Sequence, residues 1–313
     1  MKKAAPAPVL ELAGDERPVG AGGWRRRLLD WSLRHRPVPG ADDRIVAGVV
    51  GDYLTDRIRV HGRYEADELA ALDGLVLARL PALAAGTCVD VGANIGNHTL
   101  FFATRFRRVV AFEPNPLTHA LLRWNVDANG LDGAVEVHPH GLSDANGTAL
   151  IEVARANLGA SRLDGGGGGT GGRRLPVSLV RGDDVLANEA AVTFVKIDVE
   201  GHELGALLGL ERTLERHRPV VLMEQLLATA EPSTGCSAAT RRLLESGYEA
   251  HEFVWVRRTR VRWLDSALAS LRGTRRRSLR RVDRFERRDY PTLLFLQAPH
   301  VEALRRAQAG SGS

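Results

Sequence analysis

The sequence predicts an α/β protein with a seven-stranded, mostly parallel sheet, helices on both faces of that sheet and an N-terminal helical extension. Two observations support this prediction. Short apolar runs alternate with helical patterns from Thr87 onward, as they do when helices connect the strands of a parallel sheet. The first apolar run leads into the glycine-containing turn Gly92-Ala-Asn-Ile-Gly96, and the second run ends on an acid, Glu113.

The individual elements follow from local patterns. Seven apolar runs predict the core strands, at 87–91, 109–113, 134–138, 194–198, 220–224, 252–256 and 292–296. Apolar periodicity predicts helices at 66–83, about 97–105, about 117–129 and 201–217. Asn129-Gly130 and Pro219 are typical helix ends. We expect 148–153 and 176–180 to form a hairpin, and the last two strands to form an antiparallel pair.

Composition shifts divide the chain further. We expect a flexible tail over 1–44 with a short basic amphipathic segment at 24–35, a helical lead-in over 45–85, the main domain over 86–300 and a C-terminal tail over 301–313. Within the main domain, 164–172 is a glycine-rich loop and 257–288 an arginine-rich insertion. The insertion holds thirteen arginines and three acids. Such an excess suits nucleic acid, anionic lipid or an acidic substrate, but no recognised nucleic-acid module accompanies it, so we interpret it as a solvated surface insertion.

Length and charge set further limits. The chain has 313 residues, a net charge of +5 and 44% apolar residues, as is ordinary for a soluble protein. No apolar run approaches the roughly 20 residues that span a bilayer, and the N-terminus lacks the apolar core of a signal peptide. Cys88 and Cys236 have no metal or redox spacing, which favours a reducing, cytoplasmic setting.

The glycine turn and Glu113 predict a nucleoside-containing cofactor. Gly92 and Glu113 are 21 residues apart, the reach of one strand–helix–strand unit, and an acid there can accept hydrogen bonds from both ribose hydroxyls. The turn lacks the middle glycine of a dinucleotide site, and Asp90 would repel a pyrophosphate. S-adenosyl-L-methionine fits better, because it carries a ribose, a sulfonium and an ammonium group but no phosphate.

Several motifs in order resemble those of the FkbM-type methyltransferases: Asp90-Val-Gly-Ala-Asn-Ile-Gly96, Phe112-Glu-Pro-Asn115, Gly141-Leu-Ser-Asp144 and Lys196-Ile-Asp-Val-Glu-Gly-His-Glu203, with Gly62-Arg-Tyr-Glu65 as a lead-in. The resemblance covers roughly residues 50–225. It implies a class I, Rossmann-like methyltransferase domain that uses S-adenosyl-L-methionine. It also implies methylation of a small hydroxyl compound, such as a secondary metabolite or a sugar.

The expected cofactor-binding residues lie in and around the glycine turn. Gly92, Ala93, Asn94, Gly96 and Asn97 form the turn and its exit into a helix, and Asp90 serves the methionine amine through the turn backbone and water. Glu113 is expected at the ribose with Asn115 nearby, and Ser143 and Asp144 at the adenine edge. The resemblance adds Tyr64 and Glu65, which we expect to close over the cofactor.

The expected catalytic residues are Asp198 and His202, with Glu200 and Glu224 behind them. A hydroxyl acceptor must lose its proton, and a carboxylate or an imidazole can take it. Two structural alternatives remain: Glu200 and His202 can cap the following helix, and Lys196 can pair with a neighbouring acid. Asp198 and Glu224 could also hold a divalent cation, but no dedicated metal spacing is present and we expect no metal.

Two other functions remain as alternatives. A nucleic-acid methyltransferase could use the arginine-rich insertion, although the sequence has no Asn-Pro-Pro-Tyr-like box for a flipped base. A non-enzymatic scaffold of the same fold need not keep Asp90, Gly92, Gly96 and Glu113 together, as this chain does. The sequence does not indicate an oligomeric state.

Overall fold

The computed structural model describes residues 11–12, 44–154, 157–163, 173–255 and 277–310, and its centre is an eight-stranded sheet in the order β13-β12-β14-β11-β10-β3-β4-β5. The strands are β3 (Thr87–Val91), β4 (Arg108–Phe112), β5 (Val135–His138), β10 (Val192–Ile197), β11 (Val220–Gln225), β12 (Glu249–Trp255), β13 (Arg277–Arg281) and β14 (Tyr290–Leu296). Neighbours from β11 to β5 are parallel, and β14, β12 and β13 pair antiparallel. All seven predicted core strands are present, and β13 is an eighth.

A smaller sheet of four strands lies beyond the end of β5, in the order β6-β9-β7-β8. Its strands are β6 (His140–Leu142), β7 (Gly147–Ala154), β8 (Asn157–Leu163) and β9 (Arg173–Val180). The predicted antiparallel pairing is confirmed, because β7 pairs with β9, with Leu150 opposite Pro176, but β8 lies between them in the chain and pairs with the other edge of β7. Two short strands, β1 (Glu11–Leu12) and β2 (Gly48–Val49), pair parallel with each other.

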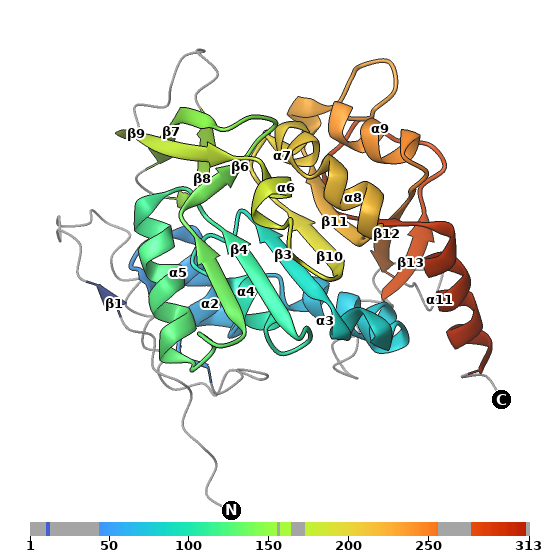
Figure 1. Ribbon diagram of the computed structural model, residues 1–313, viewed down its shortest axis with the longest axis horizontal. Helices are drawn as coiled ribbons and strands as arrows, with labels where there is room; N and C mark the ends of the chain where they lie inside the picture. The colour runs from blue at the N-terminus through green and yellow to red at the C-terminus, as the bar shows by residue number, and fades with distance from the viewer. Residues whose placement is uncertain (1–10, 13–43, 155–156, 164–172, 256–276, 311–313) are drawn as a thin grey trace, which may run out of the picture.

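Alternate residues of the central strands enter two separate cores, because successive side chains of a strand point to opposite faces. Cys88 of β3, Phe194 of β10 and Leu222 of β11 belong to the first core, whereas the neighbouring Val89 and Val195 belong to the second. Each core is closed by its own helices, so the predicted layers, with helices on both faces of the sheet, are confirmed (Figure 1).

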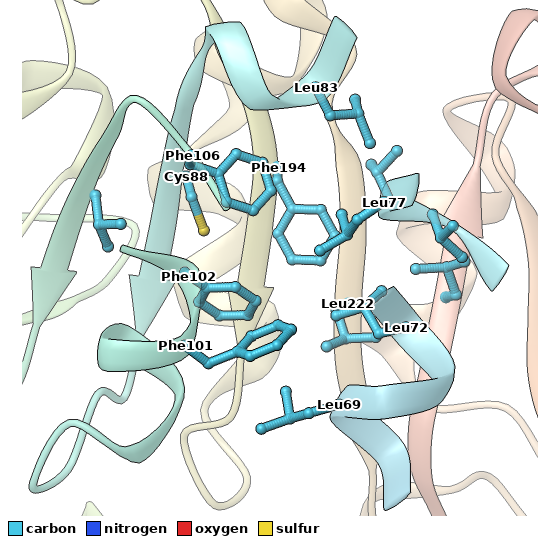
Figure 2. Close-up of a cluster of buried hydrophobic side chains, with 14 of the residues drawn as sticks. Leu69, Leu72, Leu77, Leu83, Cys88, Phe101, Phe102, Phe106, Phe194 and Leu222 are labelled. Atoms are coloured by element: carbon cyan, nitrogen blue, oxygen red, sulfur yellow. The ribbon is translucent and has the colours of Figure 1, made fainter. Parts of the chain in front are cut away.

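The first core is covered by α3 (Ala66–Leu75), α4 (Asn97–Phe102), α5 (Pro116–Ala128) and α11 (Ala298–Gly310). Figure 2 shows Phe101, Phe102 and Phe106 against Phe194 of β10, with the leucines of α3 opposite. The rings of Phe102 and Phe194 are 5.4 Å apart. This aromatic cluster fixes α4, and with it the exit of the glycine turn, against the sheet.

The second core is covered by α7 (Glu203–Gly209), α8 (Glu211–His217) and α9 (Ala238–Glu245). The remaining elements are α2 (Tyr53–His61), α6 (Gly182–Val185), η1 (Leu77–Arg79), η2 (Pro81–Ala85) and η3 (Leu227–Thr229). In Figure 1, α5 lies at one end of the sheet and α11 at the other. Residues 301–310, which we expected to be part of a C-terminal tail, belong to the helix α11.

The predicted helix over 66–83 is wrong in its second half. It ends at Leu75, and the chain continues in the two 3₁₀ helices η1 and η2. Pro81 has no N–H to donate and cannot continue an α-helix. The apolar pattern persists because Leu77, Leu80 and Leu83, spaced by three residues, all enter the first core.

The predicted single helix over 201–217 is wrong as well, because it breaks at Leu210 into α7 and α8. The buried carboxylate of Asp183 accepts hydrogen bonds from the N–H groups of Arg212 (3.1 Å) and Thr213 (2.9 Å). A side chain about thirty residues away in sequence thus caps the start of α8, and no local pattern could reveal it.

The expected end of the helix at Asn129-Gly130 is confirmed, because α5 stops at Ala128 and Gly130 takes a φ of 65°. The expected amphipathic segment at 24–35, the glycine-rich loop at 164–172 and most of the arginine-rich insertion lie outside the described residues. The described end of that insertion, from Arg277, forms β13.

Candidate functional site

The candidate site lies at the carboxyl ends of the parallel strands, where the predicted polar residues converge. Val91 of β3 is paired with Phe112 of β4 and with Ile197 of β10. The residues that follow these positions, Gly92, Glu113 and Asp198, therefore meet at one edge of the sheet. Ligands of open parallel sheets bind at this edge.

The glycine turn takes an uncommon backbone conformation. Gly92, Asn94 and Gly96 have φ angles of 77°, 52° and 97°. A Cβ atom at Gly92 would collide with the carbonyl oxygen of Asp198, so only glycine allows the turn to pack against the end of β10. The turn thereby presents its backbone toward the cavity described below.

Glu113 is held by the turn and by the start of α5. Its Oε2 accepts a hydrogen bond from the Asn94 N–H at 2.8 Å, and its Oε1 accepts from the Asn115 N–H and the Thr118 hydroxyl, both at 2.9 Å. Burial raises the pKa of Glu113, and these hydrogen bonds oppose the shift. The carboxylate is thus fixed in orientation, and Oε2, which accepts only one of the three hydrogen bonds, keeps a lone pair for a ligand.

A cavity of about 180 Å³ opens beside the turn. Ten of the predicted site residues line it: Tyr64, Gly92, Ala93, Asn94, Asn97, Glu113, Asn115, Asp198, Glu200 and His202. Four others, Asp90, Gly96, Ser143 and Asp144, are not part of its wall. Glu65 and Glu224 line a neighbouring cavity instead.

Several wall residues were not predicted. Gly141 and Leu142 line the cavity where we expected Ser143 and Asp144, so the predicted position is displaced by two residues. Leu179 of β9 and Ile151 of β7 add an apolar wall. Nothing in the sequence marks these two residues, because only the pairing of the smaller sheet brings them to this edge.

Asp90 lies beneath the turn rather than in the cavity. Its carboxylate is fully buried, accepts a hydrogen bond from the Thr99 hydroxyl at 2.6 Å and lies 3.3 Å from Lys196 Nζ. Lys196 also donates to the Gly92 carbonyl at 2.9 Å and lies 3.5 Å from Asp198 Oδ2. The alternative that Lys196 pairs with neighbouring acids is thus confirmed, and one ammonium group joins the turn to Asp198.

The lead-in segment borders the cavities at Tyr64, which lines both of them, and at Glu65, which lines the neighbouring one. The Asn97 side chain donates to the Tyr64 carbonyl at 3.1 Å and accepts from the Tyr64 N–H at 3.0 Å. Glu65 has a φ of 53°, and its Oε2 lies 3.2 Å from His98 Nε2. Burial opposes ionisation of Glu65, but the hydrogen bond and charge of His98 outweigh it and lower the pKa of that carboxyl.

The second cavity, of about 110 Å³, adjoins the first and shares Tyr64, His98, Lys196, Asp198 and Glu200 with it. Glu224 of β11 lines only this second cavity. Burial and the surrounding carboxylates, first of all Asp198 and Glu200, raise the pKa of Glu224 to about 8. This arrangement gives a half-buried carboxyl that changes protonation near neutral pH.

His202 lies on the opposite side of the site from Glu224. It precedes α7, on the face of the second core, and its Nε2 lies 3.0 Å from Ser143 Oγ. The Ser143 hydroxyl donates to Asp144 Oδ1 at 3.0 Å, so it accepts from His202, whose Nε2 carries the proton. Burial lowers the pKa of His202, which keeps the ring neutral at physiological pH.

Four of the six described arginines of the insertion are engaged with acids of this chain. Arg277 pairs with Glu68, Arg280 and Arg288 pair with Glu252, and Arg281 pairs with Glu249. These pairs reduce the positive charge that this part of the insertion offers to a nucleic acid. In the described ranges, no helix has both the length and the apolar character that crossing a bilayer requires.

Comparison with known proteins identifies a family. The sequence profile described as "Methyltransferase FkbM domain" matches residues 90–253, more than half of the chain. The hexuronic acid methyltransferase AglP of Haloferax volcanii is 34% identical over 129 residues, which are 40% of this chain and 50% of that protein. The methyltransferase sdnD of Sordaria araneosa is 27% identical over 221 residues, which are 60% of this chain and 80% of that protein.

Solved structures resemble the chain at lower identity. The FkbM methyltransferase of Methylobacillus flagellatus KT is 20% identical, with a TM-score of 0.37, over 68% of this chain and 43% of that one. An O-methyltransferase of Bacillus cereus in complex with SAH is 15% identical, with a TM-score of 0.38, over 77% of this chain and 86% of that one. The chain thus spans about half the length of the first relative and less than half of the first structure.

Proposed function

The chain belongs to the FkbM methyltransferase family, and we propose that it transfers the methyl group of S-adenosyl-L-methionine to a hydroxyl group of a small molecule, such as a sugar or a secondary metabolite. The observation that supports this most is Glu113. Its carboxylate lines the larger cavity beside the glycine turn and is fixed by three hydrogen bonds. A carboxylate so placed can accept a hydrogen bond from a ribose hydroxyl at Oε2.

The chemistry of the cavity wall fits this cofactor. Among the described residues that line the larger cavity, Lys196 is the one lysine and there is no arginine. The ammonium group of Lys196 is already engaged by Asp90, Asp198 and the Gly92 carbonyl. A pyrophosphate would find little positive charge there, whereas a sulfonium or ammonium group is favoured by the nearby carboxylates. Leu142 and Leu179 offer an apolar wall for the adenine ring. When bound, S-adenosylmethionine supplies an activated methyl carbon.

We place the acceptor in the second cavity, with its hydroxyl beside Asp198. Asp198 lines both cavities and follows directly on β10, so it marks the junction at which cofactor and acceptor would meet. Tyr64 lines both cavities and Glu65 lines the second, so both side chains would help to exclude water once the ligands are bound. The chain's residues then orient the hydroxyl and receive its proton.

The family and the relative named for a hexuronic acid favour a sugar or a similar hydroxyl compound as the methyl acceptor. The two cysteines, Cys88 and Cys236, are both free and buried, which suits a reducing compartment, and we propose the cytoplasm as the location.

Calorimetric titration with S-adenosylhomocysteine tests the cofactor. We expect micromolar binding by the wild type and a loss of at least about tenfold in the Glu113→Ala variant, because the ribose hydroxyls lose a charged acceptor. Glu136→Ala, at a partly exposed acid of β5 outside the cavity, is the matched control. A folded wild-type protein that does not bind would refute the methyltransferase proposal and favour a scaffold of the same fold.

A further inference from the structure

Glu224 occupies a distinct position among the acids of the site. Ile197 of β10 pairs with Met223 of β11, so Asp198 and Glu224 follow at neighbouring positions of adjacent strands, whose backbones lie about 4.8 Å apart. Leu222 enters the first core, and Glu224 lines the second cavity together with Leu222 and with Glu65, which precedes α3. Its carboxyl therefore faces the second cavity, where we place the acceptor.

We propose that Glu224 is the catalytic base that takes the proton of the acceptor hydroxyl, while Asp198 and His202 position the reactants. This inference rests on the proposed function and assigns the proton transfer within it. In the transfer, the acceptor oxygen forms a bond to the methyl carbon, and the electron pair of the broken carbon–sulfur bond stays on sulfur. The acceptor's O–H bond breaks, and its proton moves to a carboxylate oxygen of Glu224.

Asp198 is less suited to take this proton because it already has a cation. Its Oδ2 lies 3.5 Å from Lys196 Nζ, and protonation would give up this charge pair. Within the described part of the chain, Glu224 has neither a hydrogen bond nor an ion pair that would be lost on protonation. A base without a fixed partner can accept a proton and later release it to water at little cost.

His202 is less suited because of where its ring lies. Its protonated Nε2 is committed to Ser143, on the side of the smaller sheet, whereas the second cavity lies on the side of α3 and α4. His202 lines only the first cavity, and Glu224 lines only the second. The two predicted catalytic groups therefore cannot serve one acceptor position, and His202 is better placed beside the cofactor.

The electrostatic surroundings agree with this assignment. Four acids face Glu224 from three elements: Asp198 and Glu200 after β10, Glu203 on α7 and Glu65 before α3. Tyr64, His98 and Lys196 complete the titratable wall, and β14 adds Pro291 and Thr292, which do not titrate. Burial and the four acids raise the pKa of Glu224 to about 8, so the carboxyl takes up and releases a proton close to the working pH of most enzymes.

Sinefungin allows a test that needs no acceptor, because it carries an amine-bearing carbon in place of the methylated sulfur. The experiment compares the affinity for sinefungin with that for S-adenosylhomocysteine by calorimetry between pH 6.5 and 8.5. In the wild type, we expect the ratio of the affinity for sinefungin to the affinity for S-adenosylhomocysteine to rise with pH as Glu224 ionises. In Glu224→Gln, we expect the ratio to fall by about tenfold at pH 8.5 and to vary less with pH, with S-adenosylhomocysteine binding unchanged.

The controls separate this proposal from its alternatives. Glu215→Gln, at an exposed position of α8 outside both cavities, should behave as the wild type. If the ratio falls in Asp198→Asn but not in Glu224→Gln, Asp198 is the group at the transfer point and the proposal is wrong. Should Glu224→Gln fail to fold, a wild-type ratio that does not change with pH would overturn the proposal by itself. A wild type that binds neither ligand refutes the proposed function instead.

Discussion

Lys196 and Asp90 form a buried ion pair across the neighbouring strands β10 and β3, with 3.3 Å between Nζ and Oδ1. Their side chains are 5% and 0% exposed. Through the same ammonium group, Lys196 contacts the Gly92 carbonyl and the Asp198 carboxylate. The pair thus fixes the glycine turn relative to the junction of the two cavities and places a buried cation there.

The first prediction concerns this pair. Lys196→Met leaves the Asp90 carboxylate buried without its cation, and we expect the free energy of unfolding to fall by about 3–5 kcal/mol. The double variant Asp90→Asn, Lys196→Met removes both charges and should recover part of the loss. Urea unfolding of both variants measures the difference. Equal losses in the single and double variants would show that the unpaired Asp90 carboxylate is not what destabilises Lys196→Met.

The second prediction concerns the turn. Gly92→Ala adds a methyl group that collides with the Asp198 carbonyl at a φ of 77°, so we expect loss of S-adenosylhomocysteine binding together with lower stability. Gly130→Ala is the matched control, because it has a φ of 65° but open space around the added atom. It should cost only the backbone strain, about 1–2 kcal/mol, and leave binding intact. Thermal unfolding and calorimetry report the two effects separately.

The third prediction concerns the charge of the acceptor. Glu65, Asp198, Glu200 and Glu224 line the second cavity, so an anionic acceptor would be repelled there and a neutral or cationic one favoured. We expect methyl transfer from labelled cofactor to methyl glucoside or methyl glucosaminide to exceed transfer to methyl glucuronide by at least about tenfold at low salt. A preference for the glucuronide would contradict this electrostatic argument and agree with the acceptor in the name of the Haloferax relative.

The fourth prediction concerns acid stability. Burial lowers the pKa of His300, whose Nδ1 has no hydrogen-bond partner within the described residues. Because the folded-state pKa lies below the unfolded value, the unfolded chain binds the proton more readily, so this contribution is present above about pH 6.5 and is lost as the pH falls below it. We expect His300→Leu to lose less stability than the wild type between pH 7.5 and 5.5. Urea unfolding at the two pH values measures this difference, and equal losses would show that His300 takes up its proton equally in the folded and unfolded chain.

Much of the fold could be predicted because it is encoded by local patterns. Apolar runs in the sequence predict the strands β3, β4 and β11, and Asn129-Gly130 marks the end of α5. The spacing of Gly92 and Glu113 within one strand–helix–strand unit was enough to place both at the same edge of the sheet. Parallel strands joined by a helix carry this relationship whatever the rest of the chain does.

Only the tertiary structure decided which cavity or partner each polar side chain of the site contacts. Lys196 meets the Gly92 carbonyl across 104 residues of sequence, and Asp183 caps α8 from a different segment. Glu224 lies on β11 and lines the cavity beside the start of α3, whereas His202, in the segment between β10 and α7, contacts Ser143. Sequence periodicity reports which residues a single element buries. The face and partner of each charged side chain depend on the pairing of strands far apart in the chain, which no local pattern records.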